Sequence, residues 1–227
     1  MKPILPCFLI MLITACSQTP TTVTQSVGAC GESFSPTTGL QFSAAQQAFE
    51  SQQYFSALAL LQEIKGDYIT KDSLEADAYL KTQQWDKAQQ IYIMLLTTCL
   101  KGKAAHGLGL IASYKSQYPE AYQWLSLAVS IEPSQSNIRN DYGFILLLTG
   151  NNDEARNEFL TALELNPRNQ VAAKNLWMLL HRTERQQAAS SLQQRFSWSE
   201  QEHQKLANAA NNFTPLSIAE MEKWKRR

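Results

Sequence analysis

The sequence predicts an all-α protein built as a superhelix of antiparallel helix pairs, with a capping helix at the C-terminus. The first observation is an alanine that recurs at intervals of 31, 33, 34 and 34 residues, at Ala57, Ala88, Ala121, Ala155 and Ala189. The second is a series that runs 12 residues ahead of it, at Ala45, Ala76, Gly109, Gly143 and Trp177. From Leu40 onward the apolar residues follow helical spacing. A repeat of this period is typical of helical solenoids, whose units bury their apolar faces against one another.

Two units, residues 102–135 and 136–169, are the clearest. Each has a small residue at position 8, alanine at 20, a bulky residue at 24, a small residue at 27 and proline at 32. The first unit supplies Gly109, Ala121, Leu125, Ala128 and Pro133, and the second Gly143, Ala155, Phe159, Ala162 and Pro167. This pattern resembles the tetratricopeptide repeat. Small residues let the two helices approach closely, and proline ends the second helix because it lacks an N–H and clashes with the preceding turn.

The remaining units are less regular, as terminal repeats usually are. Those at about 40–66 and 69–100 lack the final proline, and the one at about 170–196 has Trp177 where a small residue is expected. We expect about five repeats over residues 40–196. In the tail, 197–227, Ser199 and Glu202 predict a capping box at the start of a helix that reaches about Ala210. The tail ends in a basic sequence, and it either caps the last pair or serves as a short docking segment.

The N-terminus has the layout of a secretory signal, with one charge before a short apolar run from Ile4 to Ile13. The run is about half the length of a membrane-spanning helix. Its end, Ile13-Thr14-Ala15-Cys16, resembles the lipobox of bacterial lipoproteins. The resemblance implies removal of residues 1–15, lipidation of Cys16 and, with Ser17 next to it, a lipid anchor at the periplasmic face of the outer membrane. The alternatives to the lipobox are an ordinary signal peptide or a buried N-terminal helix, and the alternative location is the inner membrane.

Residues 16–39, rich in Ser, Thr and Gln, are predicted to form the lipidated N-terminus and a flexible tether. Two further cysteines, Cys30 and Cys99, would lie in a compartment that permits disulfides. The sequence leaves open whether they form a bridge or remain as two thiols.

The sequence shows no catalytic or metal-binding motif, which favours a binding protein over an enzyme, and we expect no metal, cofactor or small-molecule substrate. Formal charge is balanced, with 20 basic and 20 acidic residues, so the sequence lacks the basic excess of a nucleic-acid-binding protein. The three histidines, His106, His181 and His203, are widely spaced and form no metal-binding motif. A hydrolase using His106 or His181 is the enzymatic alternative.

In tetratricopeptide proteins, positions 2, 5, 9 and 12 of the first helix face a concave groove that binds peptides. The resemblance therefore implies a protein-binding groove that contains Lys103, His106, Leu110, Ser113, Asn137, Asn140, Phe144, Leu147, Val171, Lys174, Met178 and His181. Each has a simpler interpretation. Phe144 and Met178 at helical spacing could be core, Asn140 could bond to backbone, and the lysines could be solvated.

Three segments, Asn137 to Gly143, Asp153 to Arg156 and Ala162 to Leu165, resemble the TadD lipoproteins of tight-adherence (Flp) pilus assembly. This resemblance implies a scaffold whose partners are the outer-membrane secretin or other pilus-assembly components. The pilotin of type IV pili, which has a similar stretch, and a general envelope-assembly scaffold are the alternatives.

Replacing Cys16 by serine tests the lipid anchor. The Cys16→Ser chain cannot be acylated, and acyl chains supply about 0.8 kcal/mol of membrane affinity per buried methylene. We expect the variant to move from the membrane pellet to the soluble periplasmic fraction, as measured by immunoblotting. A variant that stays wholly in the pellet would contradict the anchor.

Overall fold

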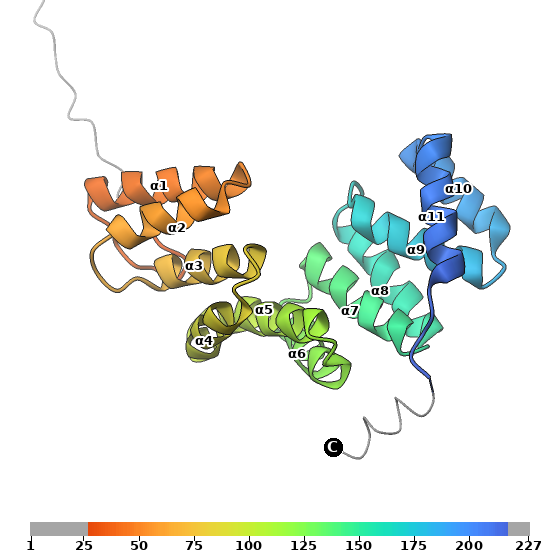
Figure 1. Cartoon of the computed structure of the whole chain (residues 1–227), viewed down its shortest axis with the longest axis horizontal. Coiled ribbons are helices and arrows are strands. Elements are labelled where there is room, and N and C mark those ends of the chain that lie inside the picture. The colour runs from red at the N-terminus through yellow and green to blue at the C-terminus, as the bar shows by residue number, and fades with distance from the viewer. Residues whose placement is uncertain (1–26, 218–227) are drawn as a thin grey trace, which may run out of the picture.

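The computed structural model describes residues 27–217, and within this range it contains eleven α-helices (Figure 1). The first three pairs are α1 (Pro36–Glu50) with α2 (Tyr54–Glu63), α3 (Ile69–Lys81) with α4 (Trp85–Leu95), and α5 (Lys101–Tyr114) with α6 (Tyr118–Ile131). The next two are α7 (Ser136–Leu148) with α8 (Asn152–Leu165) and α9 (Gln170–Arg182) with α10 (Gln186–Phe196). The last helix is α11 (Glu200–Asn212).

Each helix packs mainly against its neighbours in sequence, so the pairs stack in chain order from one end of the molecule to the other. The predicted all-α architecture of repeated helix pairs is confirmed. Between residues 27 and 217, the only β-type pairing is an isolated antiparallel bridge between Val27 and Ser33. None of the helices in this range has both the length and the apolar character that crossing a bilayer requires.

The repeated small residues lie where the two helices of a pair meet. All five alanines of the first series are at most 1% exposed. A Cβ atom added to Gly109 would lie 2.6 Å from Cγ of Leu125, and one added to Gly143 would lie 2.8 Å from Cε1 of Phe159. The residue at position 24 of each clear repeat therefore fills the space that the glycine at position 8 leaves.

Each pair also turns in the same way. The residue five before the recurring alanine adopts the left-handed conformation in all five turns, with φ of 62° at Gln52, 59° at Gln83, 57° at Ser116, 79° at Gly150 and 58° at Glu184. This conformation commonly ends a helix, because it lets the next backbone N–H groups bond to carbonyls of the last turn. One such bond joins Gln53 N to Ala48 O at 2.9 Å.

The N-terminal boundary differs from the prediction. Helix α1 begins at Pro36, inside the predicted 16–39 tether, and residues 27–35 are folded against the repeats. Phe34 is only 4% exposed because it packs with Phe42 and Tyr68, and Ser35 caps α1 by accepting a hydrogen bond from Thr38 N at 3.1 Å. A tether that reaches residue 39 is therefore wrong. Cys16 and the signal segment lie outside the described residues.

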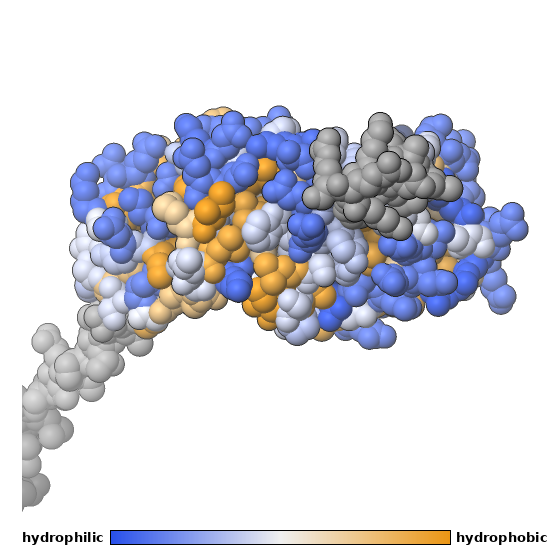
Figure 2. Space-filling view, turned by 90° about the horizontal axis from the view of Figure 1, so that it is seen from below, coloured by the Kyte–Doolittle hydropathy of each residue, from blue (hydrophilic) through white to orange (hydrophobic). Residues whose placement is uncertain are grey.

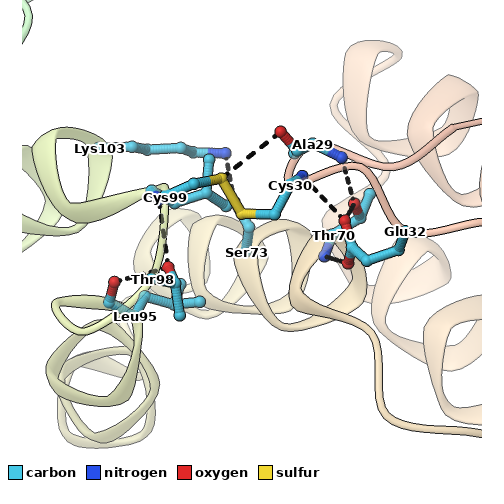
Figure 3. The surroundings of a disulfide bond; sticks show 10 residues. Ala29, Cys30, Glu32, Thr70, Ser73, Leu95, Thr98, Cys99 and Lys103 are labelled. Carbon is cyan, nitrogen blue, oxygen red and sulfur yellow. Dashed lines mark hydrogen bonds between the residues drawn. A yellow bond between two sulfur atoms is a disulfide. The ribbon is translucent and has the colours of Figure 1, made fainter.

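A disulfide joins the folded N-terminal segment to the residues just before α5 (Figure 3). The Cα atoms of Cys30 and Cys99 are 5.8 Å apart, within the usual range for a bridge. Glu32 reinforces the attachment, since its carboxylate accepts hydrogen bonds from Cys30 N at 2.9 Å and Thr70 N at 2.8 Å. Partial burial opposes ionisation of Glu32, but these backbone hydrogen bonds outweigh it and lower the pKa of the carboxyl group.

Helix α11 starts with the predicted capping box, in which Ser199 and Glu202 bond to each other's backbone N–H. It packs on α9, where His203 meets the ring of Trp177 edge-on at 5.2 Å. Trp198, 8% exposed, fixes the start of the helix by donating a hydrogen bond to Gln170 Oε1 at 2.9 Å. Trp177 at position 8 thus contacts the capping helix. The basic end of the tail lies outside the described part of the chain.

The close approach of α7 and α8 predicts that Gly143→Ala destabilises the protein, because the new methyl group would overlap the Phe159 ring. Overpacking of this kind costs about 1–3 kcal/mol of unfolding free energy, measurable by urea denaturation. Gly102→Ala is the matched control, since its methyl group meets the flexible carboxyl end of Glu132. Equal stability of the two variants would contradict the packing argument.

Candidate functional site

The first helices of the pairs border two adjoining cavities in the N-terminal half of the molecule. The larger, of about 350 Å³, lies between α1, α3, α5 and the start of α7. The second, of about 320 Å³, shares Phe49 and Lys103 with it and extends to Ala29, beside the disulfide. We call the two together the N-terminal groove. It is lined by Phe49, Ser73, Asp77, Leu80, Lys103, His106, Leu110, Glu132, Asn137 and Ile138, among others.

An ion pair crosses the groove between α3 and α5. Nζ of Lys103 lies 2.7 Å from Oδ2 of Asp77 and donates a hydrogen bond to Oγ of Ser73 at 2.6 Å. Asp77 also accepts a hydrogen bond from the Tyr92 hydroxyl at 2.6 Å. Figure 3 shows Lys103 and Ser73 next to the disulfide, so the covalent link and this polar cluster hold the same end of the groove.

The polar contacts continue from α5 to α9. His106 Nε2 lies 2.7 Å from Oδ2 of Asp141, and Oδ1 of Asp141 accepts a hydrogen bond from Asn140 Nδ2 at 3.0 Å. Asn140 Oδ1 in turn accepts from Asn175 Nδ2 at 2.9 Å. These residues, with Ser73, Asp77 and Lys103, form a polar ladder that ties each first helix to the next from α3 to α9. The ladder adds directional contacts between successive first helices to the apolar packing of the stack.

Four of the predicted groove residues, Lys103, His106, Leu110 and Asn137, line the larger cavity. Ser113 is half-buried and its hydroxyl donates to Gly109 O of its own helix. Val171 is 59% exposed.

Three of the other predicted residues are buried, and this corrects the predicted groove. Leu147 and Met178 belong to the largest apolar core, and Asn140, 4% exposed, is enclosed within the ladder. Leu147 and Met178 face the packed interior, whose apolar cluster also includes Trp198 and Ala210 from the C-terminal part of the chain. Among the rest, Lys174 pairs with Glu202 of α11 at 3.7 Å, and His181 stacks on Trp177 at 4.8 Å.

Sequence reasoning missed four polar residues of the site, Ser73, Asp77, Asp141 and Asn175. Ser73 and Asp77 lie in the irregular second repeat, at positions 5 and 9, where we drew no groove residues. Asp141 and Asn175 both lie at position 6, outside the predicted set. The recurrence of a short polar side chain at that position in two successive repeats was a signal that could have identified them.

The described residues contain no cluster of three or more His, Cys, Asp or Glu side chains that could hold a metal ion. His106 and His181, the histidines of the hydrolase alternative, have different surroundings. The first bonds to a carboxylate in the ladder and the second stacks on an indole.

Outside the groove, exposed apolar residues lie on the second helices of two pairs, α4 and α6. Ile93 and Met94 on α4 are 51% and 59% exposed, and Ile131 on α6 is 40% exposed. Figure 2 shows apolar areas near the middle of the corresponding face, within a mostly hydrophilic surface.

Tyr92 makes stability sensitive to alkaline pH. Burial, and then the nearby charge of Asp77, raise the pKa of its hydroxyl well above 10. In the unfolded chain Tyr92 ionises near pH 10, whereas in the folded chain it stays protonated. Unfolding therefore releases a proton above pH 10, and stability falls as the pH rises.

We expect the unfolding free energy of the unmodified chain to fall more steeply above pH 10 than that of Tyr92→Phe, by up to about 1.4 kcal/mol per pH unit. Urea denaturation at several pH values measures the two slopes. Tyr114→Phe, at a tyrosine that is 54% exposed, should follow the unmodified chain. Parallel slopes for the unmodified and Tyr92→Phe chains would contradict the burial of the hydroxyl.

Known proteins share this architecture. The TPR repeat-containing protein PA4299 of Pseudomonas aeruginosa is 33% identical over 153 residues, which cover 67% of this chain and 62% of that protein. The chain thus matches less than two thirds of the length of this relative. No known protein-family model matches the chain.

Solved structures show the same fold. The Pseudomonas aeruginosa PilF structure has a TM-score of 0.61 at 16% identity and covers 84% of this chain and 97% of its own. MamA from Desulfovibrio magneticus RS-1 has a TM-score of 0.55 at 14% identity and covers 72% of this chain and 94% of its own. The fold of this chain is that of the tetratricopeptide-repeat proteins.

Proposed function

We propose that this protein is a membrane-anchored periplasmic scaffold for the assembly of a tight-adherence (Flp) pilus, and that it acts in the manner of a pilotin on the outer-membrane secretin. The observation that carries the proposal is the N-terminal groove. It is an open, partly apolar channel whose walls come from separate repeats, held in place by a disulfide and the polar ladder. Such a channel suits a peptide segment of a partner protein.

Two further features support this role. The lipobox at Cys16 would hold the groove close to a membrane, where a secretin is assembled. The groove also mixes apolar side chains such as Leu110 and Ile138 with the charges of Lys103 and Glu132, so it can accept both an apolar side chain and polar backbone groups of a ligand.

The pilotin of type IV pili remains a second candidate, and one observation favours it. Helix α11 packs on α9 after the fifth pair, so the helical stack extends beyond the five repeats. A general envelope-assembly scaffold fits the same groove with other partners.

Deleting the gene tests the proposal in a strain that makes the pilus. We expect loss of detergent-resistant secretin multimers on immunoblots and loss of surface pili, with both restored by the unmodified chain. Asn137→Arg places a long charged side chain at the exposed edge of the groove, so it should restore multimers several-fold less well. Asn157→Arg, at an exposed position on α8, is the matched control and should complement fully.

Normal multimers and normal pili in the deletion strain would overturn the proposal. If type IV pili were lost and tight-adherence pili were kept, the second candidate would take its place. Full complementation by His106→Ala and His181→Ala would rule out hydrolysis by these residues.

A further inference from the structure

The chain after α11 does not continue the stack. In a further repeat it would turn into a second helix, but instead residues 213–217 run in irregular conformation back across the ends of α9 and α7 (Figure 1). The backbone N–H of Leu216 donates a hydrogen bond to Leu148 O, at the end of α7, at 2.8 Å. We call residues 213–217 the return segment.

Arg182, at the end of α9, holds the start of the return segment. Its Nη1 atom donates hydrogen bonds to Phe213 O at 2.7 Å and to Ala210 O at 2.8 Å. The guanidinium carbon also lies 5.0 Å from the centre of the Phe213 ring, a cation–π distance. One arginine side chain therefore binds both the backbone and the side chain of the same residue.

The other wall of the Phe213 site is Phe144 of α7. The two rings are 6.2 Å apart and meet edge to face, an attractive arrangement. Phe144 is at position 9, one of the positions expected to face a ligand. The return segment thus covers, on α7 and α9, the surface that corresponds to the N-terminal groove on α3 and α5.

These contacts have the form of a bound peptide. An aromatic side chain fills a site between a ring and a cation, and two backbone groups, Phe213 O and Leu216 N, are hydrogen-bonded to the walls. Phe213 and Leu216 are both only half-buried. By contrast, Trp198 at the start of α11 is 8% exposed, so the return segment can open while α11 stays docked.

We propose that the surface formed by Phe144, Leu148 and Arg182 is a second peptide-binding site for an extended partner segment that carries an aromatic residue. The return segment occupies this site in cis, and the partner segment binds by displacing it. The return segment belongs to the same chain, so its effective concentration at the site is high. A separate peptide of equal intrinsic affinity must compete with it, and therefore binds weakly until the contact of the return segment is weakened. The proposal deepens the scaffold function proposed above, because it adds a regulated surface to the same stack.

A labelled peptide with the sequence of residues 211–217 is the probe, and fluorescence anisotropy measures its binding to full-length chains. Phe213→Ala removes the ring with which the chain fills its own site. The edge-to-face and cation–π contacts of such a ring together correspond to about a tenfold difference in affinity. We expect the peptide to bind Phe213→Ala about tenfold more tightly than the unmodified chain. Phe55→Ala removes a phenylalanine that is 70% exposed on α2, and it should match the unmodified chain.

Two changes test the site itself. Adding Arg182→Gln to Phe213→Ala removes the cation and should abolish the gain in affinity, and so should replacing the phenylalanine of the peptide by alanine. Arg182 is exposed, so the substitution leaves the core intact, and circular dichroism of the variant checks this.

Several results would overturn the inference. One is that the peptide binds the unmodified and Phe213→Ala chains with equal affinity. Another is that Arg182→Gln leaves binding unchanged, and a third is that the peptide binds neither chain. A chain that forms dimers by exchanging return segments would make a second copy the occupant, and would also overturn it. The assay uses purified protein, so its outcome is independent of whether pili or secretin multimers are lost in the deletion strain.

Discussion

The close approach of the two helices in each pair determines how the whole stack is built. An α-helix pair can come this near only if small side chains lie at the crossing point, and the alanine at position 20 is fully enclosed in each of the five pairs. Because the same crossing recurs about every 34 residues, each pair presents its first helix to the next pair in the same orientation. The groove is a consequence of that repetition, since it consists of the faces of successive first helices.

The polar ladder adds a second level of order to this packing. Apolar contacts between alanines and leucines are not directional, so by themselves they would allow neighbouring pairs to rotate slightly. The contacts from Asp77 to Lys103 and from His106 to Asp141 are directional, so they favour one angle between successive pairs. Four residues of the ladder, Ser73, Asp77, Lys103 and His106, line the open groove.

The sequence was sufficient for the fold because the periodic small residues carry the packing information directly. Lys103, His106, Leu110 and Asn137 share the lining of one cavity, because in the regular repeats position in the unit determines which face a side chain is on. Leu147 and Met178 were predicted wrongly, because their burial depends on α11 and residues 213–217, which follow no repeat pattern.

The turns between the helices of each pair also carried little signal in the sequence. Only one of the five left-handed residues is a glycine, and the glutamines, serine and glutamate at the others are held there by the repeated geometry.

The disulfide has a mechanical consequence. Cys30 and Cys99 are 69 residues apart, so α1 to α4 lie within a closed covalent loop. A force applied along the chain from the N-terminus passes from Cys30 through the sulfur atoms to Cys99, and so reaches the start of α5 without stretching the backbone between them. The first two pairs are therefore outside the path of the load. If the chain is pulled between a membrane and a partner, the pairs after the bridge carry the tension, while the N-terminal wall of the groove keeps its shape.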